Sequence, residues 1–418
     1  MRRTKIKNSS ARQHSLSFLS LPAAAHTSRT QSIPILANLP QSVSLSLFLK
    51  MSTFSTIITI LLLIPIVFVL VYLFLSHHRL PRSGPLSSVT AAPPHHQLRI
   101  LTQNLWLHYL VIAPHRSYRV QKFVENVARH DFDIVAVQEA FLLRVGPFVL
   151  SDHVKQLIEG MRDIGYHYWT DPTASLPQLI GQNSGLIVFS RLPFAAQSSD
   201  VFTHSDEITN NKGFVGVQFN FATSTSSSNS SNDNDSNTNL HLGYNSSQNL
   251  DHRSIRTMHL YCTHLDSRLQ STKEKQVAEL AARLQSFDLT NTAIVALGDF
   301  NICQRSYGTL TARGRSHYYE ELITTLRGRY ELVNAFDSDD YVTHRDKMPR
   351  GSMVLYAVTF GLLGPALPTS MPTRGLALDH LFFNPSVLRL LQRDILNWSS
   401  ESIPVSDHLG CCATLELL

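Results

Sequence analysis

Two polar residues, Asp299 and Asn301, close the apolar stretch Ala293-Ile-Val-Ala-Leu-Gly-Asp-Phe-Asn301. Its aliphatic residues predict a buried strand that ends near the glycine. Because residues two apart on an extended backbone point to the same side, the carboxylate and the carboxamide emerge together. Such a pair suits a phosphate group and a hard divalent cation. The alternative interpretation of this stretch alone is an ordinary turn after a strand.

Polar residues of the same kind follow several other apolar runs. Taken singly, each has a structural explanation, such as a turn residue, an acid at a helix N-terminus or a hydrogen-bonded core histidine. Together they are hard to assign to turns, because catalytic groups gather in loops that a rigid scaffold positions. The residues concerned are Asn104, Glu139, His264 with Asp266, Asp379 with His380, and Ser406-Asp407-His408.

The order of these motifs resembles the endonuclease/exonuclease/phosphatase superfamily, the DNase I-like phosphodiesterases. The motifs run N, QE, SGL…SR, THL, GDFN, DH and SDH, and the resemblance covers roughly residues 98–418. The stretches LRILTQNLWLHYL and TNNKGFVGVQF are similar to the neutral sphingomyelinase branch. One departure is His380, which follows Asp379 where relatives commonly carry Tyr.

The resemblance implies a Mg²⁺ cofactor, for which Mn²⁺ would substitute. Glu139 would be the main ligand of the ion, Asn104 a second ligand, and Asp407 would lie close to it. His408 would be the general base that activates water, with Asp379 orienting its ring through the other nitrogen.

The remaining roles implied by the resemblance concern the phosphoryl group. His264 and Asn301 would donate hydrogen bonds to the phosphoryl oxygens, and Asp299 would position the water or the leaving group. In the sphingomyelinase branch, a Lys-Gly at a strand start and an acid upstream form a regulatory pair. Lys212 with Glu207 matches that pattern; Asp206 is the other candidate acid, and an ordinary solvated lysine is the alternative for Lys212.

Apolar runs joined by helical patterns and hairpins predict an α+β fold with two sheets and helices outside them. The resemblance makes this a four-layer α/β sandwich with two packed, mainly antiparallel sheets. We expect a basic, Ser-rich, disordered leader (1–53), a transmembrane helix (54–75), a linker (76–97) and the catalytic domain (98–418). A polar, low-complexity insertion (221–253) is expected to be disordered.

Residues 54–75 contain 22 positions without a charge, which is long enough to cross the hydrocarbon core of a bilayer. We therefore expect a single-pass membrane protein, with a cleaved signal peptide as the alternative. Arg79, Arg82 and Arg99 after the span favour a cytosolic body if the chain starts at Met51. The seven basic residues of a leader that starts at Met1 favour the opposite orientation.

A second apolar segment, 353–368, is interrupted by Gly and Pro and is too short to span a bilayer. It is either a buried strand and loop or an interfacial hairpin that reaches a lipid headgroup.

Charge is uneven along the chain. The sequence carries 36 Lys and Arg against 31 Asp and Glu. Seven of the basic residues and none of the acidic ones lie in the first fifty positions, so positions 51–418 carry a net charge of −2. This argues against a basic groove for nucleic acid. The four cysteines form no CxxC or zinc pattern.

Together these features predict a membrane-anchored, Mg²⁺-dependent phospholipase C-type phosphodiesterase. It would cleave a membrane lipid, either sphingomyelin or a related phosphosphingolipid, to ceramide and the phosphorylated headgroup. The alternatives are a nuclease or a soluble-phosphoester phosphatase of the same fold, and a catalytically inactive membrane tether. The sequence leaves the oligomeric state open.

Overall fold

The computed structural model describes residues 56, 58–67, 69–70, 80–88, 97–109, 113–222, 255–287, 292–304, 315–328, 331–337, 343, 376–398 and 404–418. The predicted leader, the segment 353–368 and all of the insertion beyond Ala222 lie outside these residues. The chain divides into two units, 1–68 and 69–418, and the strands and helices that follow belong to the second.

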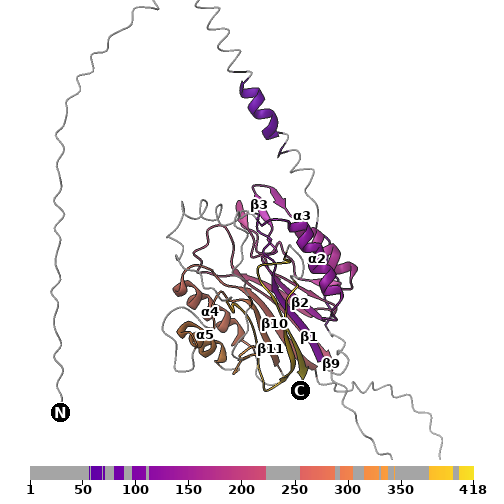
Figure 1. Ribbon diagram of the computed structural model, residues 1–418, viewed down its shortest axis with the longest axis vertical. Helices are drawn as coiled ribbons and strands as arrows, with labels where there is room; N and C mark the ends of the chain where they lie inside the picture. The colour runs from indigo at the N-terminus through magenta and orange to yellow at the C-terminus, as the bar shows by residue number, and fades with distance from the viewer. Residues whose placement is uncertain are drawn as a thin grey trace, which may run out of the picture. The chain divides into compact units, whose positions relative to one another are not determined.

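In the described part of the chain, two six-stranded sheets form the centre of this body (Figure 1). The first sheet has the spatial order β14 (Leu388–Leu396), β15 (Gly410–Leu417), β1 (Gln97–Asn104), β2 (Ile134–Gln138), β7 (Ile187–Ser190), β5 (Tyr168–Trp169). The second has the order β12 (Val333–Asn334), β13 (Asp379–Phe383), β11 (Thr292–Asp299), β10 (Ile255–His264), β9 (Gly213–Ala222), β8 (Ala196–Val201).

Helices cover the outer faces of both sheets, so the body has four layers (Figure 1). The first sheet packs against α2 (Arg116–Ala128) and α3 (Asp152–Asp163), and the second against α4 (Gln270–Leu284) and α5 (His317–Arg327). The inner faces of the sheets meet in a core that includes Phe219, Leu260 and Val295. The prediction of an α+β sandwich with outer helices is confirmed.

Both central strand pairs, β1–β2 and β10–β11, are parallel, whereas the outer pairings of the two sheets are antiparallel. A strand covered on both faces reads as a continuous apolar run, and β2 and β11 are buried along their whole length. This explains why the strands that lead to the polar motifs stand out in the sequence.

A small third sheet has the order β4 (Phe148–Leu150), β3 (Leu143–Val145), β6 (Ile180–Gln182). Sequence patterns did not predict it, because strands of three residues are too short to show a periodicity. It follows directly after the β2–Glu139 segment and returns to the main sheet through β7.

The prediction of a transmembrane helix at 54–75, and of a single-pass membrane location, is wrong. Among the described residues, no helix is long and apolar enough to cross a membrane. Helical positions in this segment are described between 56 and 70.

Gly298 is the position where β10 and β11 come closest. Its φ is +134°, and a Cβ built there would lie 2.0 Å from the carbonyl oxygen of Thr263. Only glycine meets both conditions without displacing a strand. The glycine of the GDFN motif is therefore needed for the pairing that brings His264 beside Asp299.

We predict that Gly298→Ala lowers the free energy of unfolding by about 3 kcal/mol or more, because backbone strain and a backbone clash act together. Gly146→Ala is the matched control, since Gly146 has a φ of +59° and no described atom within 4 Å of a built Cβ. The control should lose only about 1 kcal/mol. Urea unfolding of both variants measures the difference, and equal losses would contradict the steric explanation.

Candidate active site

The predicted site residues meet at one end of the sandwich because four strands finish there. Asn104 ends β1, and Glu139 follows β2, its parallel neighbour. His264 ends β10 and pairs in register with Asp299, which ends β11. Asp299 in turn pairs with Asp379 at the start of the antiparallel strand β13. The directions of these strands thus explain why five of the predicted residues lie at the same end of the sandwich.

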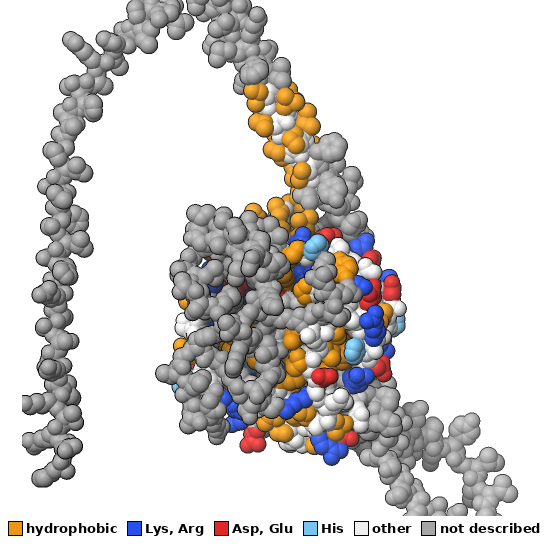
Figure 2. Space-filling view, viewed as in Figure 1, with side chains coloured by type: hydrophobic (Ala, Val, Ile, Leu, Met, Phe, Trp, Pro, Cys, Tyr) orange, Lys and Arg blue, Asp and Glu red, His pale blue; other side chains and the backbone are white. Residues whose placement is uncertain are grey.

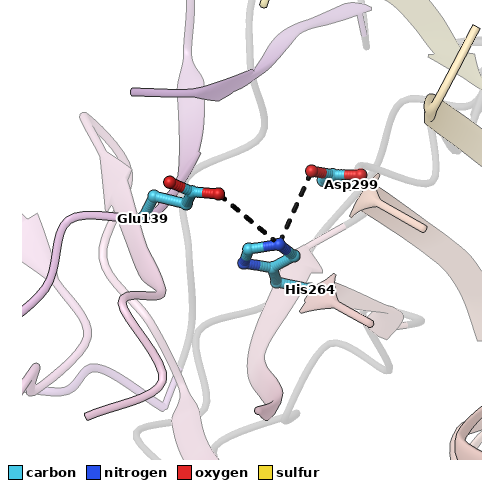
Figure 3. A group of neighbouring side chains, drawn as sticks. All are labelled: Glu139, His264 and Asp299. Carbon is cyan, nitrogen blue, oxygen red and sulfur yellow. Dashed lines mark ion pairs between the residues drawn. The ribbon is translucent and has the colours of Figure 1, made fainter. Parts of the chain in front are cut away.

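Glu139 and Asp299 lie on either side of the His264 ring (Figure 3). The Nε2 atom of His264 is 3.5 Å from Asp299 Oδ2 and 3.8 Å from Glu139 Oε1. The side-chain amide of Asn104 donates hydrogen bonds of 3.0 Å to both carboxylates. Asn104 thereby ties acids from the two sheets together. Its own oxygen accepts from the backbone N–H of Trp106.

Two of the site residues have left-handed backbone conformations. Glu139 has φ 59° and Asn301 has φ 50°, values that cost non-glycine residues energy and persist only when the surroundings fix them. At Glu139 the surroundings include Gly185, where a Cβ would lie 3.1 Å from the Glu139 Cα and 2.8 Å from Phe141. The fold thus holds Glu139 in a conformation that aims its carboxylate at the site.

His408 and Asp379 form a buried pair next to these acids. His408 Nδ1 is 2.7 Å from Asp379 Oδ2, and His408 Nε2 is 3.7 Å from Asp299 Oδ2. Burial disfavours the charged ring, but the carboxylates of Asp379 and Asp299 outweigh it and hold the pKa of His408 well above its usual value. The loop that carries His408 is fixed by Gln103, whose side-chain amide donates a hydrogen bond to the backbone carbonyl of His408.

Lys212 is a buried member of the site, with 2% of its surface exposed, which excludes the alternative of a solvated loop lysine. Its Nζ lies 2.7 Å from His264 Nε2 and 3.5 Å from Glu207 Oε2. Burial, and then the charge of Lys212, lower the pKa of His264 to about 4. The acid that approaches Lys212 is Glu207, because the Asp206 carboxylate accepts from Thr272 instead.

Asn301 and Asp407 occupy less central places. The Asn301 backbone N–H donates to Asp299 Oδ1, and its side-chain amide donates to the carbonyl of Leu265. Asp407 accepts from the Ser406 hydroxyl at 3.1 Å. Among the described His, Cys, Asp and Glu side chains, neither group of converging ligand atoms includes Asp407.

The unusual His380 faces away from the reacting groups. Burial lowers its pKa to about 4, so the ring is neutral. Its Nε2 lies 2.8 Å from the carbonyl of Ile302, and its Nδ1 lies 3.1 Å from the Asn334 amide. A neutral ring that donates from Nε2 and accepts at Nδ1 satisfies both contacts. His380 therefore anchors the loop that carries Asn301.

Sequence reasoning missed two contributors. His108 places its Nε2 2.8 Å from Glu139 Oε2. Arg119, with 3% of its surface exposed, donates to the carbonyls of Val405 and Trp106 and so joins the loops that carry His408 and Asn104. A signal for Arg119 existed, since it lies on the same helical stripe as the buried Phe123 and Val127. No comparable pattern marked His108.

The donor set fits a hard divalent cation. Two groups of side chains, Glu139 with His264 and Asp299, and Asp299 with Asp379 and His408, each have ligand atoms within 4.8 Å of one another. Buried carboxylates this close repel each other and are stabilised by a cation, and oxygen ligands favour Mg²⁺ or Mn²⁺. Glu139 and Asp299 are the residues that would hold it.

The comparisons with known proteins agree with this geometry. A family model described as the Endonuclease/Exonuclease/phosphatase family matches residues 101–408. The chain therefore belongs to this family, and the predicted superfamily is confirmed. No curated protein matches the chain.

Several solved structures are similar in fold. Sphingomyelinase C from Streptomyces griseocarneus is 16% identical, with a TM-score of 0.48 over 76% of this chain and 99% of that chain. Beta toxin from Staphylococcus aureus, as a mutant with bound magnesium ions, is 13% identical, with a TM-score of 0.45 over 76% and 99%. TDP2 from D. rerio, complexed with a single-strand DNA product, is 12% identical, with a TM-score of 0.45 over 77% and 99%.

We predict that Mg²⁺ raises the midpoint of thermal unfolding, since a ligand that binds only the folded state stabilises it. Glu139→Gln and Asp299→Asn should remove most of this rise, because each deletes a charged ligand. Asp163→Asn is the control, as its side chain is 68% exposed at the end of α3. Differential scanning fluorimetry across a Mg²⁺ titration tests this, and a full rise in both site variants would place the ion elsewhere.

Proposed function

We propose that the protein is a Mg²⁺-dependent phospholipase C-type phosphodiesterase. It hydrolyses sphingomyelin, or a related phosphosphingolipid, to ceramide and the phosphorylated headgroup. The observation that carries the proposal is the buried His408–Asp379 pair, joined at 2.7 Å and placed beside Asp299 and His264. A histidine base, an orienting acid and a phosphate-binding edge are the parts that phosphodiester hydrolysis needs.

In this proposal, His408 is the general base. Asp379 accepts a hydrogen bond from the Nδ1–H of the ring, and the deprotonated Nε2, 3.7 Å from Asp299 Oδ2, takes a proton from water. Because the pKa of His408 is raised, the share of rings that can act as the base grows with rising pH. The water oxygen forms a bond to phosphorus while the bond from phosphorus to the ceramide oxygen breaks. The leaving ceramide oxygen takes up a proton from solvent, and the proton that His408 removed from the attacking water returns to solvent. Asp299 orients the water relative to the phosphorus.

The opposite edge of the site binds the phosphoryl oxygens. His264 and the Asn301 amide act as neutral donors, and Lys212 adds a buried positive charge 2.7 Å from the His264 ring. Such fixed donors stabilise charge as it builds on the phosphate. A divalent cation held by Glu139 and Asp299 would neutralise charge and orient the phosphate. Asn104 keeps those two acids in place, Asp407 lies at the edge of the site, and Glu207 sets the position of Lys212.

The choice of a phosphosphingolipid rests on the sequence. The stretches around Asn104 and Lys212-Gly213 are similar to the neutral sphingomyelinases, and Lys212 is buried in the site. The net charge of −2 over positions 51–418 gives no indication of the basic surface that a nuclease uses to bind a DNA backbone. A lipid substrate is therefore favoured over nucleic acid.

A substrate panel on the purified full chain with Mg²⁺ tests the proposal. The panel holds sphingomyelin, inositol phosphosphingolipid, lysophospholipid and supercoiled DNA, with headgroup release and nicking as readouts. We expect headgroup release from one of the two sphingolipids and intact DNA. Nicking of the DNA without release from any lipid would overturn the assignment.

We further predict that His408→Ala lowers turnover by at least about 100-fold, the usual contribution of a general base. Asp379→Asn should cause a similar loss, because the ring loses its orienting acceptor. His167→Ala is the control, since this histidine lies in an exposed turn before β5. Initial rates under saturating Mg²⁺ measure the effect, and a fully active His408→Ala enzyme would exclude His408 as the base.

A further inference from the structure

Four exposed aliphatic side chains lie together beside the site. We call them the apolar rim: Val145 on β3, Leu179 and Ile180 at the start of β6, and Ile208 in the loop before β9. Their exposed fractions are 41%, 72%, 71% and 96%. Figure 2 shows hydrophobic side chains at the end of the body where Figure 1 labels β3. Single exposed aliphatic residues are common, but a contiguous group marks an interaction surface.

Backbone contacts make the rim continuous. Val145 pairs directly with Ile180 across β3 and β6, and the Gly146 N–H donates to the carbonyl of Leu179. On the other side of β6, the N–H of Gln182 donates to the carbonyl of Thr209 at 2.8 Å, which fixes the loop that carries Ile208. The four side chains are therefore held by paired backbone.

The acids next to Ile208 are turned inward. Glu207 accepts from the backbone and hydroxyl of Ser267, and Asp206 accepts from the Thr272 hydroxyl. The backbone N–H groups of Asp206 and Glu207 both donate to Asp266. The loop thus satisfies its charges internally and leaves an isoleucine pointing to solvent.

The rim is joined to the site through Gln182. The Gln182 side chain accepts from the Tyr109 N–H at 2.8 Å and lies 3.3 Å from His108 Nδ1. The other nitrogen of His108 contacts Glu139 at 2.8 Å. Only one side chain, His108, therefore separates the strand that carries the rim from a carboxylate of the site.

Basic groups stand behind the rim. A hollow of about 610 Å³ is lined by Arg82 and Arg144, together with Trp169 and Asp171. The Nε of Arg144 is buried without a hydrogen-bond partner among the described atoms. Asp171 is already engaged, since its carboxylate accepts from the backbone and hydroxyl of Thr173. Positive charge beside apolar side chains is complementary to a phospholipid surface, with phosphates above acyl chains.

We propose that the apolar rim docks on a phospholipid bilayer and inserts Leu179, Ile180 and Ile208 among the acyl chains, with Arg144 and Arg82 near the lipid phosphates. The inference rests on the proposed lipid-directed function, because docking here presents the site to headgroups at the bilayer surface. A second copy of the chain or another segment of it would not need the two arginines.

Quenching of tryptophan fluorescence by brominated lipids, measured on the full chain, tests whether the apolar rim contacts the bilayer. Ile180→Trp adds a reporter on the rim, and Leu391→Trp adds one at a 42% exposed position on β14 as the matched control. With phosphatidylcholine vesicles, we expect the emission maximum of the tryptophan introduced by Ile180→Trp to shift to shorter wavelength. Brominated acyl chains should quench the emission of this tryptophan, while the emission of the tryptophan introduced by Leu391→Trp stays unchanged.

Other outcomes overturn the proposal. Equal quenching of both reporters would mean that the protein contacts vesicles with no preference for the rim. A reporter on the rim that is blue-shifted before vesicles are added, and insensitive to bromine, would mean that the chain itself covers the rim. A shift that depends on protein concentration alone would assign the rim to a second copy.

A second experiment separates this inference from the proposed function. The double variant Leu179→Ser/Ile180→Ser should lower hydrolysis of sphingolipid in vesicles by about tenfold or more, since each side chain loses the gain of burial. Leu391→Ser should keep the parent rate. If the parent protein hydrolyses no sphingolipid while bromine quenches the rim reporter, the proposed function fails and docking stands. Full vesicle hydrolysis by the double variant would overturn the docking.

Discussion

The repulsion between buried carboxylates is the constraint on which this structure depends. Glu139, Asp299 and Asp379 come from different segments, yet Asp299 lies in one group with Glu139 and His264 and in a second group with Asp379 and His408. Burial alone would protonate such acids. Instead, His108, His264 and Lys212 outweigh burial and hold the pKa of Glu139 well below its ordinary value, while His408 and His264 outweigh burial and lower the pKa of Asp299. The negative carboxylates and the basic side chains of the site thus stabilise one another, and this combination requires residues from both sheets.

Polar contacts between the sheets keep that balance in place. Asn104 on the first sheet binds Asp299 on the second, and Gln138 donates to Cys262 across the same interface. Arg119 ties the β1 loop to the loop before β15. A hydrogen bond to a buried group is costly to leave unmade, so the Asn104 and Gln138 contacts resist sliding of one sheet over the other, while the Arg119 contacts fix two loops of the first sheet. The geometry of the site is therefore a property of the whole sandwich.

Sequence patterns were informative where burial was greatest. The strands before Glu139 and Asp299 are nearly continuous apolar runs, and those before Asn104 and His264 are rich in aliphatic residues, so the strands and the polar residues at their ends could both be predicted. Strands β8 and β14 could not, because their exposed positions break the apolar pattern. The contact of His108 with Glu139 and the contact of Lys212 with His264 also escaped prediction, since each depends on distant segments meeting. The apolar run at 54–75 led to a wrong prediction because length and hydropathy alone do not establish a spanning helix.

The pairing of β15 with β1 has a consequence for how the protein is made. Gln103 and His408, which hydrogen-bond at the site, are 305 positions apart. The first sheet has a gap between β1 and β14 until β15 fills it, and the histidine base arrives just ahead of that strand. Contacts this distant in sequence form late and slowly. A ribosome-bound chain that stops before residue 407 contains Glu139, Asp299 and Asp379 but lacks His408, so under the proposed mechanism hydrolysis begins only after the last residues of the chain have been made.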